Sequence, residues 1–391
     1  MLNRLHFDFC FDFFILSYTM MFILTFTNAR RFPMKHIVLT GGGTAGHVTP
    51  NIALIPKLKE AGYKISYIGS YDGIEKQLIE DMNIPYYGIS SGKFRRYLSL
   101  KNLTDPFKVI KGISEAKKLL KELDPSIVFS KGGFVSVPVV RAAASLGIPV
   151  IIHESDMTPG LANKLCLSSA SVVCCNFPET ANYLPKDKAV VTGTPIRDEL
   201  MKGKADAAKE FCGFTDDKPV ILVMGGSLGS VVLNNAVRGS ISELLKKFNV
   251  IHLCGKGKLD PTLNDTPGYR QYEYIKKELA DMFALSSIVI SRAGANAISE
   301  ICSLSKPNLL IPLSEKASRG DQVLNAKSFE KQGFSMVIEE EDLTAESFLQ
   351  AVSSLYDNRQ KYIDAMNGSV NTDSTSMIIS LIEKNKKVAA Q

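Results

Sequence analysis

Residues Ile37–His47 read IVLTGGGTAGH. An apolar run enters a glycine-rich loop, and a histidine follows the last glycine. Gly41, Gly43 and Gly46 satisfy the G-x-G-x-x-G spacing, in which a strand turns tightly into a helix whose free amides can bind a phosphate. The stretch therefore predicts the first strand and helix of a doubly wound α/β sheet.

This spacing leaves the ligand of the loop open. An NAD enzyme should carry an acidic residue about 20 positions further on, at the end of the second strand. Here that strand ends Ile68-Gly69-Ser70, and Asp72 falls in the following loop. The sequence therefore disfavours NAD and leaves two interpretations, a different phosphate ligand or a turn needed only for packing.

The same pattern of strand, glycine loop and helix restarts at Val220–Ser230, VILVMGGSLGS. Between and after the two loops, short apolar runs alternate with helical patterns, which is typical of parallel sheets with crossover helices. We therefore expect two doubly wound domains joined near Thr192–Arg197. The expected strands are His36–Thr40, Lys64–Ile68, Ser126–Ser130, Pro149–His153, Ser171–Cys175, Val220–Met224, Val250–Cys254, Ser287–Ser291, Asn308–Ile311 and Ser335–Glu339.

Composition is that of a folded globular protein. Of the 391 residues, 45% are hydrophobic and 22% charged, and the net charge is +6. This mild basicity permits contact with anionic lipid or a phosphorylated ligand but does not indicate a nucleic-acid partner. The seven cysteines are scattered without C-x-x-C spacing, which favours reduced thiols over disulfides, and no metal-ligand motif is present.

Residues 1–33 differ from the rest of the chain. Phe13–Thr27 is almost wholly apolar and is followed by Arg30-Arg31. A membrane-spanning helix needs about 20 such residues, so this one is short. Two interpretations follow, a short anchor that keeps the rest of the chain in the cytosol or an extension that is not translated. We favour the second, with Met34 as the start, because the first core strand begins directly after it.

Several polar residues stand where strands end, the position of ligands in open α/β sheets. His47 could act as a general base at neutral pH, or merely cap a helix. Ser227 and the amides of Gly225–Gly229 could hold a diphosphate. Glu300 could accept hydrogen bonds from a ribose, and Asp321, Gln322 and Asn325 could bind a sugar, or these residues could be ordinary helix-surface or capping groups.

Two further segments have competing interpretations. His153-Glu154-Ser155-Asp156 ends a buried strand, and its carboxylates could bind an acceptor or pair with Arg197. Basic and aromatic residues alternate in Lys93–Tyr97 and Pro106–Lys111, a composition typical of an interfacial segment on anionic lipid, although a surface helix with snorkelling lysines would look the same. The residues expected at a membrane are Lys93, Phe94, Arg95, Arg96 and Phe107.

Taken together, these motifs resemble glycosyltransferase family 28, specifically its MurG-type members. The resemblance runs from Met34 to about Lys387, keeps the same order in both halves and is specific only in combination. It is carried by GGGTAGHVTP at Gly41–Pro50, KGGFVSVP at Lys131–Pro138, HESDMTPGLANK at His153–Lys164, GTPIR at Gly193–Arg197, GGSLG at Gly225–Gly229, SRAGANAISE at Ser291–Glu300 and RGDQVLNA at Arg319–Ala326.

The resemblance implies a GT-B fold, two Rossmann-like domains separated by a cleft. Residues 34–196 would form the acceptor and membrane domain, 197–369 the UDP-sugar domain, and a helix near 370–388 would pack back on the first. The implied reaction inverts the sugar linkage. It transfers N-acetylglucosamine from UDP-N-acetylglucosamine to the 4-hydroxyl of undecaprenyl-diphospho-N-acetylmuramoyl-pentapeptide, the step from lipid I to lipid II in peptidoglycan synthesis.

The resemblance also implies roles for individual residues. His47 and Glu154 become the candidate catalytic residues, and which of them is the base stays open. Acceptor contacts are expected at Gly42, Gly43, Gly132 and Gly133, with Thr44 also on the acceptor side. Donor contacts are expected at Thr44, Gly46, Arg197, Gly226, Ser227, Ile275, Ala295, Glu300, Gln322 and Asn325.

This chain departs from many family members at Phe134, Asp156 and Asp321, where Tyr, Asn and Gln are common, so Phe134 and Asp156 receive no catalytic role. The alternatives are another GT-B lipid glycosyltransferase, a UDP-sugar epimerase, an NAD(P)-dependent oxidoreductase and a non-catalytic scaffold. No cofactor or metal is expected. The expected partners are the two substrates, anionic lipid and cell-wall synthesis or division proteins, at the cytoplasmic face of the membrane.

Overall fold

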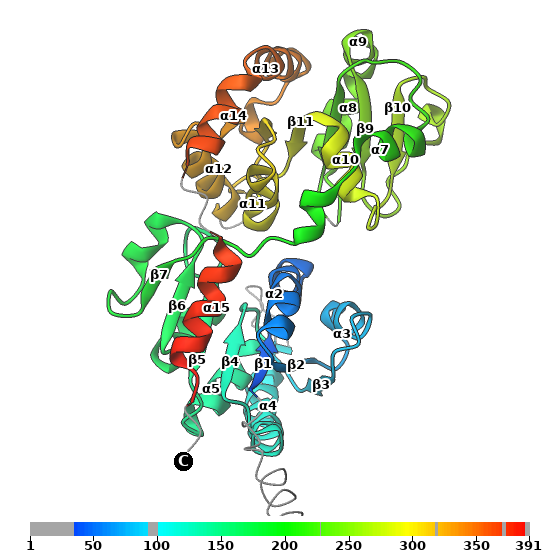
Figure 1. The fold of residues 1–391 in the computed structure, drawn as a ribbon. Helices are drawn as coiled ribbons and strands as arrows, with labels where there is room; N and C mark the ends of the chain where they lie inside the picture. Colours follow the sequence, from blue (N-terminus) through cyan, green and yellow to red (C-terminus); the bar gives the residue numbers. More distant parts are fainter. Residues whose placement is uncertain (1–34, 93–100, 227, 317–319, 370–372, 388–391) are drawn as a thin grey trace, which may run out of the picture.

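A computed structural model describes residues 35–92, 101–226, 228–316, 320–369 and 373–387. The chain forms two α/β halves, one above the other in Figure 1. The first half comprises strands β1–β7 with helices α2–α6 and α15, and the second comprises strands β8–β13 with helices α7–α14. None of the helices formed by the described residues is long and apolar enough to cross a bilayer. The extension at 1–33 lies outside the described residues.

The sheet of the first half has seven parallel strands in the order β3-β2-β1-β4-β5-β6-β7. The order reverses between β1 and β4, so the loops after these two strands open a crevice at the carboxyl edge of the sheet. The strands are β1 His36–Thr40, β2 Lys64–Ser70, β3 Tyr86–Ile89, β4 Ile127–Ser130, β5 Val150–Glu154, β6 Val172–Cys175 and β7 Ala189–Val191.

The sheet of the second half repeats this plan with six parallel strands in the order β10-β9-β8-β11-β12-β13. Its order reverses between β8 and β11. The strands are β8 Val220–Met224, β9 Asn249–Leu253, β10 Tyr269–Tyr272, β11 Ser286–Ser291, β12 Asn308–Leu310 and β13 Ser335–Val337.

Helices cover both faces of each sheet (Figure 1). In the first half these are α2 Thr49–Glu60, α3 Ile74–Glu80, α4 Lys101–Leu123, α5 Ser136–Ser145, α6 Leu161–Cys166 and α15 Ser374–Asn385. In the second they are α7 Ala205–Cys212, α8 Val231–Gly239, α9 Ile241–Lys247, α10 Leu279–Leu285, α11 Ala295–Ser303, α12 Asp321–Lys331, α13 Ala345–Asp357 and α14 Arg359–Gly368. Short 3-10 turns occur at Ala45–His47, Leu167–Ser169, Pro178–Tyr183, Asp198–Lys202, Pro261–Leu263 and Glu340–Asp342.

Strand β1 shows why helices must cover both faces of the sheet. Ile37 and Leu39 are fully buried on one face, whereas Val38 is fully buried on the other, because successive side chains of a strand alternate. Such a strand reads as a continuous apolar run, and this is the pattern from which the sequence predicts a parallel sheet. The predicted fold class is confirmed.

The chain crosses between the halves twice. It leaves the first half after β7 and returns through α15, which lies beside α2 in Figure 1. Ile378 and Ile382 of α15 are fully buried against the first sheet. Glu383 forms an ion pair with Lys35 at 2.9 Å, and Asp373 forms one with Lys57 at 2.8 Å. The last helix therefore completes the core of the first half.

Candidate active site

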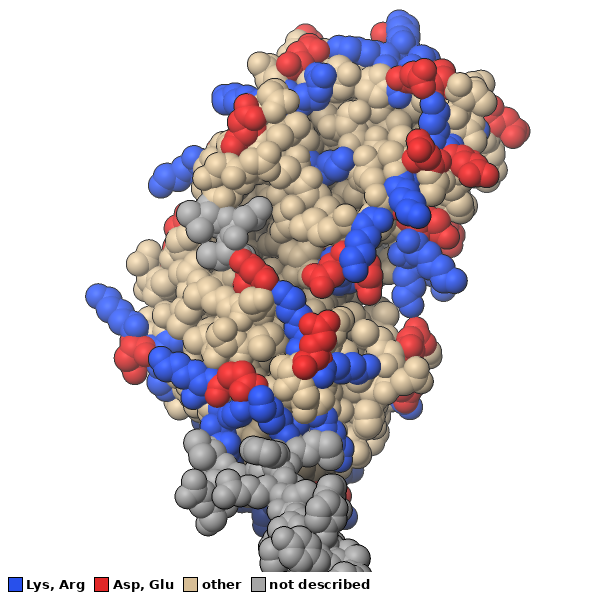
Figure 2. Space-filling model, in the orientation of Figure 1, with Lys and Arg blue, Asp and Glu red and all other residues tan. Residues whose placement is uncertain are grey.

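A cleft of about 500 Å³ lies between the halves. Figure 2 shows the hollow between the lower and upper parts of the molecule. Loops after β1, β4 and β5 line it from the first half, and loops after β8 and β11 line it from the second. The two points where strand order reverses therefore face the same cavity, as expected for ligand sites of doubly wound sheets.

The glycine loop after β1 is held by an internal carboxylate. Glu75 is fully buried, and its carboxylate accepts hydrogen bonds from the Gly43 amide at 3.1 Å and the Ser70 amide at 3.0 Å. A Cβ added at Gly42 would lie 2.4 Å from this carboxylate. The Glu75 carboxylate therefore binds the Gly43 amide, one of the amides that the phosphate of a dinucleotide would need. This contact argues against dinucleotide binding by the loop.

His47 ends the short turn that follows this loop and lines the cleft. Its Nδ1 lies 2.9 Å from the Thr44 hydroxyl oxygen. When Nδ1 donates to that oxygen, Nε2 carries the lone pair that a general base uses. Asn296 of the second half donates from Nδ2 to the Gly46 carbonyl at 2.8 Å, so the other half of the molecule also holds the turn.

Glu154 lines the cleft but already has three hydrogen-bond donors. Its Oε1 accepts from the Asp156 amide at 3.0 Å, and its Oε2 accepts from the Gly160 amide at 2.9 Å and from Asn163 Nδ2 at 2.8 Å. Burial and the nearby Asp156 charge raise the pKa of Glu154, while these hydrogen bonds oppose the rise. Through these hydrogen bonds Glu154 stabilises the conformation of the loop that leads into α6.

Glu300 and Arg197 meet at the second half's side of the cleft. Arg197 Nη2 lies 3.0 Å from Glu300 Oε1, and both side chains are mostly buried. Burial raises the pKa of Glu300, and the Arg197 guanidinium opposes this rise. Arg197 therefore pairs with Glu300. The sequence also left open a pairing of Arg197 with the carboxylate of Glu154 or Asp156, and the structure does not form it.

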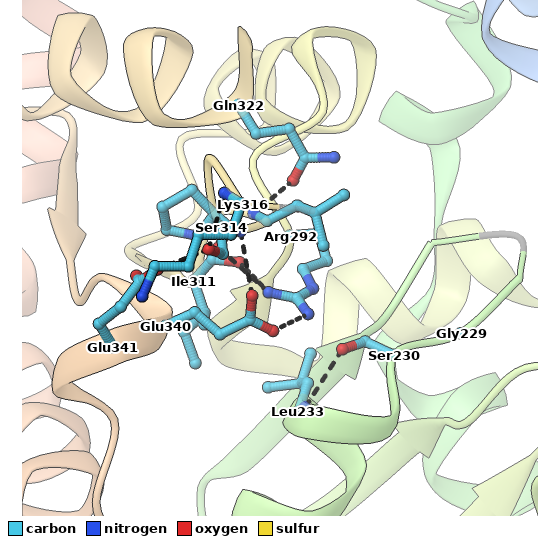
Figure 3. Close-up of polar contacts among 12 residues, drawn as sticks. Gly229, Ser230, Leu233, Arg292, Ile311, Ser314, Lys316, Gln322, Glu340 and Glu341 are labelled. Atoms are coloured by element: carbon cyan, nitrogen blue, oxygen red, sulfur yellow. Dashed lines mark hydrogen bonds and ion pairs between the residues drawn. The ribbon is translucent and has the colours of Figure 1, made fainter. Parts of the chain in front are cut away.

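Gln322 is positioned by the loop after β12. Its Oε1 accepts from the Leu313 amide at 3.0 Å, and its amide nitrogen points away from that loop in Figure 3. The loop is itself anchored, because buried Arg292 donates to the Ile311 carbonyl at 3.1 Å and pairs with Glu340 at 2.6 Å. Gln322 thus presents an amide donor to the cleft, and the loop that positions it is itself held by Arg292.

Asn325 lies in the contact between the halves. It is fully buried, its Oδ1 accepts from the Met157 amide at 3.0 Å, and its Nδ2 donates to Asp156 Oδ1 at 3.1 Å. Next to it, the Thr158 hydroxyl donates to Asp321 Oδ1 at 3.0 Å. Both the oxygen and the nitrogen of the Asn325 side-chain amide therefore bind residues of the first half. Asn325 could contact a sugar only if the two halves separated at this point.

The structure brings most of the predicted site residues to one cavity. Those lining the cleft are Thr44, Gly46, His47, Glu154, Arg197, Gly226, Ile275, Ala295, Glu300 and Gln322. Gly42, Gly43, Gly132 and Gly133 form the turns after β1 and β4 and are not among the residues that line the cleft. Ser227 and Lys93, Phe94, Arg95 and Arg96 lie outside the described residues. Phe107 lies on α4 and is 74% exposed.

Among the residues of this region that carried no predicted role, Glu75, Lys131 and Asn296 have contacts that shape the site. Glu75 lies in a helix after β2, and nothing in its local sequence shows that it folds back onto the glycine loop. Asn296 and Lys131 stand in motifs that the sequence singles out, but only the packed structure shows that they line the cleft. Among the described residues, no group of three His, Cys, Asp or Glu side chains is arranged to hold a metal ion.

Comparison with known families agrees with this architecture. The family model for the glycosyltransferase family 28 N-terminal domain matches residues 37–174, and that for the C-terminal domain matches residues 220–382. Two doubly wound sheets facing one cleft define the GT-B class of glycosyltransferases. The matched segments cover most of the chain, and the chain belongs to glycosyltransferase family 28.

Relatives and solved structures give the same picture. The chain is 65% identical over 354 residues to the UDP-N-acetylglucosamine--N-acetylmuramyl-(pentapeptide) pyrophosphoryl-undecaprenol N-acetylglucosamine transferase of Lachnospira eligens, covering 90% of this chain and 100% of that one. It is 61% identical over 350 residues to the protein of the same name from Clostridium tetani, covering 90% and 98%. The crystal structure of Acinetobacter baumannii MurG superposes with a TM-score of 0.70 at 28% identity, covering 90% of this chain and 99% of that one.

A UDP-GlcNAc 2-epimerase from Methanocaldococcus jannaschii also superposes, with a TM-score of 0.64 at 14% identity, covering 90% of this chain and 100% of that chain. At this identity the likeness shows a shared fold alone. Fold therefore does not separate a transferase from an epimerase, and the closer sequence relatives do.

Proposed function

We propose that this chain transfers N-acetylglucosamine from UDP-N-acetylglucosamine to the 4-hydroxyl of undecaprenyl-diphospho-N-acetylmuramoyl-pentapeptide. The relatives that are 65% and 61% identical carry names that describe this transfer. The observation that carries the proposal is the shared cleft, where His47 of the first half and Glu300, Arg197 and Gln322 of the second line one cavity. A transfer between two bound substrates needs both sets of groups in one place.

We assign the acceptor to residues 34–196 and the donor to residues 197–369. On the donor side, Glu300 would hold the ribose with Arg197 orienting its carboxylate, and Gln322 would contact the sugar. The amides after β8 would face the diphosphate, where oriented backbone donors stabilise the negative charge that develops as UDP leaves.

The proposed reaction is a single displacement that inverts the sugar linkage. His47 Nε2 takes the proton of the acceptor 4-hydroxyl as that oxygen bonds to the sugar's anomeric carbon, and the bond to the UDP oxygen breaks on the opposite face. The Thr44 contact supports His47 as the base because it orients the imidazole. Glu154 is the weaker candidate, since three donors already bind its carboxylate.

The decisive experiment measures UDP release by protein that begins at Met34. The assay contains UDP-N-acetylglucosamine and a lipid-diphosphate muramoyl-peptide analogue, with and without chelator. UDP release that requires the acceptor and persists with chelator supports the transferase. UDP release without acceptor, or epimerised UDP-sugar as the product, would contradict it, and donor binding without any release would favour a scaffold.

We further propose that the protein acts at the cytoplasmic face of the membrane, on anionic lipid contacted by α4. Phe107 and Ile110, one helical turn apart on α4, are 74% and 66% exposed, with Lys108 and Lys111 beside them. Figure 2 shows lysine and arginine side chains gathered toward the end of the first half where Figure 1 places α4. Exposed apolar groups among lysines favour an anionic lipid surface.

Co-sedimentation with vesicles tests this membrane contact. Full-length protein should bind vesicles containing anionic phospholipid, and binding should fall in F107S/I110S and at high salt. Equal binding to neutral vesicles, or no loss in the double variant, would contradict the assignment. Contacts with cell-wall synthesis or division proteins stay a prediction.

A further inference from the structure

Lys131 is a buried cation at the floor of the cleft. It follows β4 directly, lines the cavity and is only 2% exposed. Its position is at the reversal point of the first sheet, beside the glycine loop after β1. A Cβ added at Gly41 would lie 3.2 Å from the Lys131 Cβ, which shows how closely the two strand ends pack.

The direct hydrogen-bond partners of the Lys131 ammonium are uncharged. It donates to His153 Nδ1 at 2.7 Å and to the Ser155 hydroxyl. His153 Nε2 lies 2.8 Å from the Gly193 carbonyl, so this nitrogen donates and Nδ1 accepts. Burial and the neighbouring Lys131 charge hold the pKa of His153 well below its usual value, which keeps the imidazole neutral at pH 7.

A buried ammonium with neutral partners is costly. Burial lowers the pKa of Lys131 to about 8, although the charges of Glu154 and Asp156 oppose the change. Removing such a charge from water is unfavourable unless an opposite charge or a ligand compensates. An ammonium has three hydrogens, and two are used by His153 and Ser155. Because the net shift is still downward, the charges of Glu154 and Asp156 compensate the burial only in part, and an anion entering the cleft would add to that compensation.

The support of Lys131 is rigid. Gly132 and Gly133 follow it with φ of +86° and +82°, and a Cβ at Gly133 would lie 2.2 Å from the Gly42 carbonyl oxygen. His153, which binds the ammonium, is fully buried. Because the ammonium is held in a fixed position, it can determine where an anionic substrate binds. A transfer site requires such fixed positioning of its substrates.

We propose that Lys131 contacts the diphosphate of the lipid acceptor and fixes the acceptor hydroxyl beside His47. This role rests on the proposed function. Two diphosphates would enter the cleft, one on each substrate. The first half is the acceptor side and the loop after β8 faces the donor diphosphate, so the acceptor is the source that the location of Lys131 favours.

A cycle that changes both the enzyme and the substrate tests the contact. The catalytic efficiency kcat/KM is measured for wild type and Lys131→Met with acceptor analogues that carry a diphosphate or a single phosphate. Removing one phosphate should cost the wild type about 10- to 100-fold, the range for a hydrogen bond to a charged group. The same removal should cost Lys131→Met much less, because its partner is already gone.

The donor arm measures the affinity of UDP and UMP for the same two proteins by calorimetry. We expect Lys131→Met to leave the ratio of the two affinities unchanged. A changed UDP-to-UMP ratio without coupling to the acceptor phosphate would overturn the acceptor assignment. Equal phosphate penalties in wild type and Lys131→Met would overturn any diphosphate contact. A wild type that transfers no sugar would instead refute the proposed function.

Two further variants control for folding. Lys131→Gln keeps a donor for His153 without the charge, and it should show the same loss of coupling as Lys131→Met. Lys306→Met removes a partly buried ammonium, one bound to the Ala284 and Ser286 carbonyls in the second half. It should keep the full phosphate penalty, and loss of the penalty in Lys306→Met would attribute the effect to general destabilisation.

Discussion

His47 and Glu154 differ in what already binds them, and this difference separates their variants. His47→Ala should lower kcat by about 10²–10⁴-fold, the usual contribution of a general base. Because His47 belongs to the first half, the affinity for UDP-N-acetylglucosamine should hold. Calorimetry and steady-state rates check both values, and a loss confined to donor affinity would refute His47 as base.

Glu154→Gln should behave differently because it changes a structural group. The new amide places N–H groups against donors from Asp156, Gly160 or Asn163. Leaving such buried donors unpaired costs about 1–3 kcal/mol. We therefore expect a lower free energy of unfolding together with lower activity. Unchanged stability with a rate loss as large as that of His47→Ala would move the base to Glu154.

Gly133 is predicted to tolerate no side chain. Its φ of +82° disfavours any other residue, and a Cβ would overlap the Gly42 carbonyl. Gly147 is the matched control, since its φ is +66° but nothing lies within 4 Å of its added Cβ. Gly147→Ala should cost about 1–2 kcal/mol for the backbone alone. Gly133→Ala should cost a further 1–3 kcal/mol, roughly, for the overlap. Urea unfolding measures both, and equal losses would contradict the overlap.

Among the elements, helix α15 makes folding stability sensitive to acid. Burial raises the pKa of Glu383, but hydrogen bonds from Lys35, Lys386 and Tyr63 outweigh it and lower the pKa to about 2. A carboxylate with a depressed pKa stabilises the fold above its unfolded pKa, near 4.5, and this contribution disappears as the pH falls toward 2. The Tm difference between wild type and Glu383→Gln should therefore shrink across this window.

An exposed carboxylate provides the control for this acid effect. Glu122 on α4 has a side chain that is 59% exposed, and Glu122→Gln should match the wild type at every pH. A Tm difference for Glu383→Gln that stays constant from pH 5 to pH 2 would show that the ion pair contributes nothing. Because the Glu383 side chain is 33% exposed, the effect should also weaken with added salt.

The same elements show how far sequence patterns reach. Central strands such as β1 and β8 are buried on both faces, so their continuous apolar runs predict them correctly. Strands β3, β7 and β10 were not predicted, and each lies at the edge of its sheet. Each of these three strands has only three or four residues and is mostly only partly buried, so short runs such as AVV and YRQY give little signal to detect.

For the whole molecule, Asn325 distinguishes a contact between the halves from a contact with the sugar. Asn325→Ala removes two hydrogen bonds across the contact, to Met157 and Asp156. We expect a larger radius of gyration by X-ray scattering and a lower kcat, because transfer needs both halves together. Affinity for UDP-N-acetylglucosamine should hold. A loss of that affinity with an unchanged radius would place Asn325 in the sugar pocket.

Asp81→Asn is the control for this prediction. Asp81 forms an ion pair with Lys276 across the halves at 3.3 Å, but both side chains are substantially exposed. Exposed ion pairs contribute little, so neither the radius nor kcat should change. A comparable opening in Asp81→Asn would mean that the contact between the halves is generally weak.

Predicting the site from sequence succeeds where a motif holds its chemistry locally and stops where distant segments meet. The segments containing His47 and Glu300 could be recognised in the sequence, because in each a strand end, small residues and a polar group follow in order. The pairing of Asn296 with the Gly46 carbonyl joins segments far apart in the chain, and so does the Arg197–Glu300 ion pair. Such contacts depend on how two separately folded sheets dock, which no local pattern encodes.

The return of the chain through α15 has a consequence for protein synthesis. A ribosome releases the first half long before it makes Ser374–Asn385, yet Ile378 and Ile382 fill part of that half's core. Until then, the apolar surface that α15 will cover stays open to water and to chaperones. A segment made late therefore completes a part made much earlier, and a message truncated just before α15 would yield a chain with strands β1–β13 but an unfinished first half.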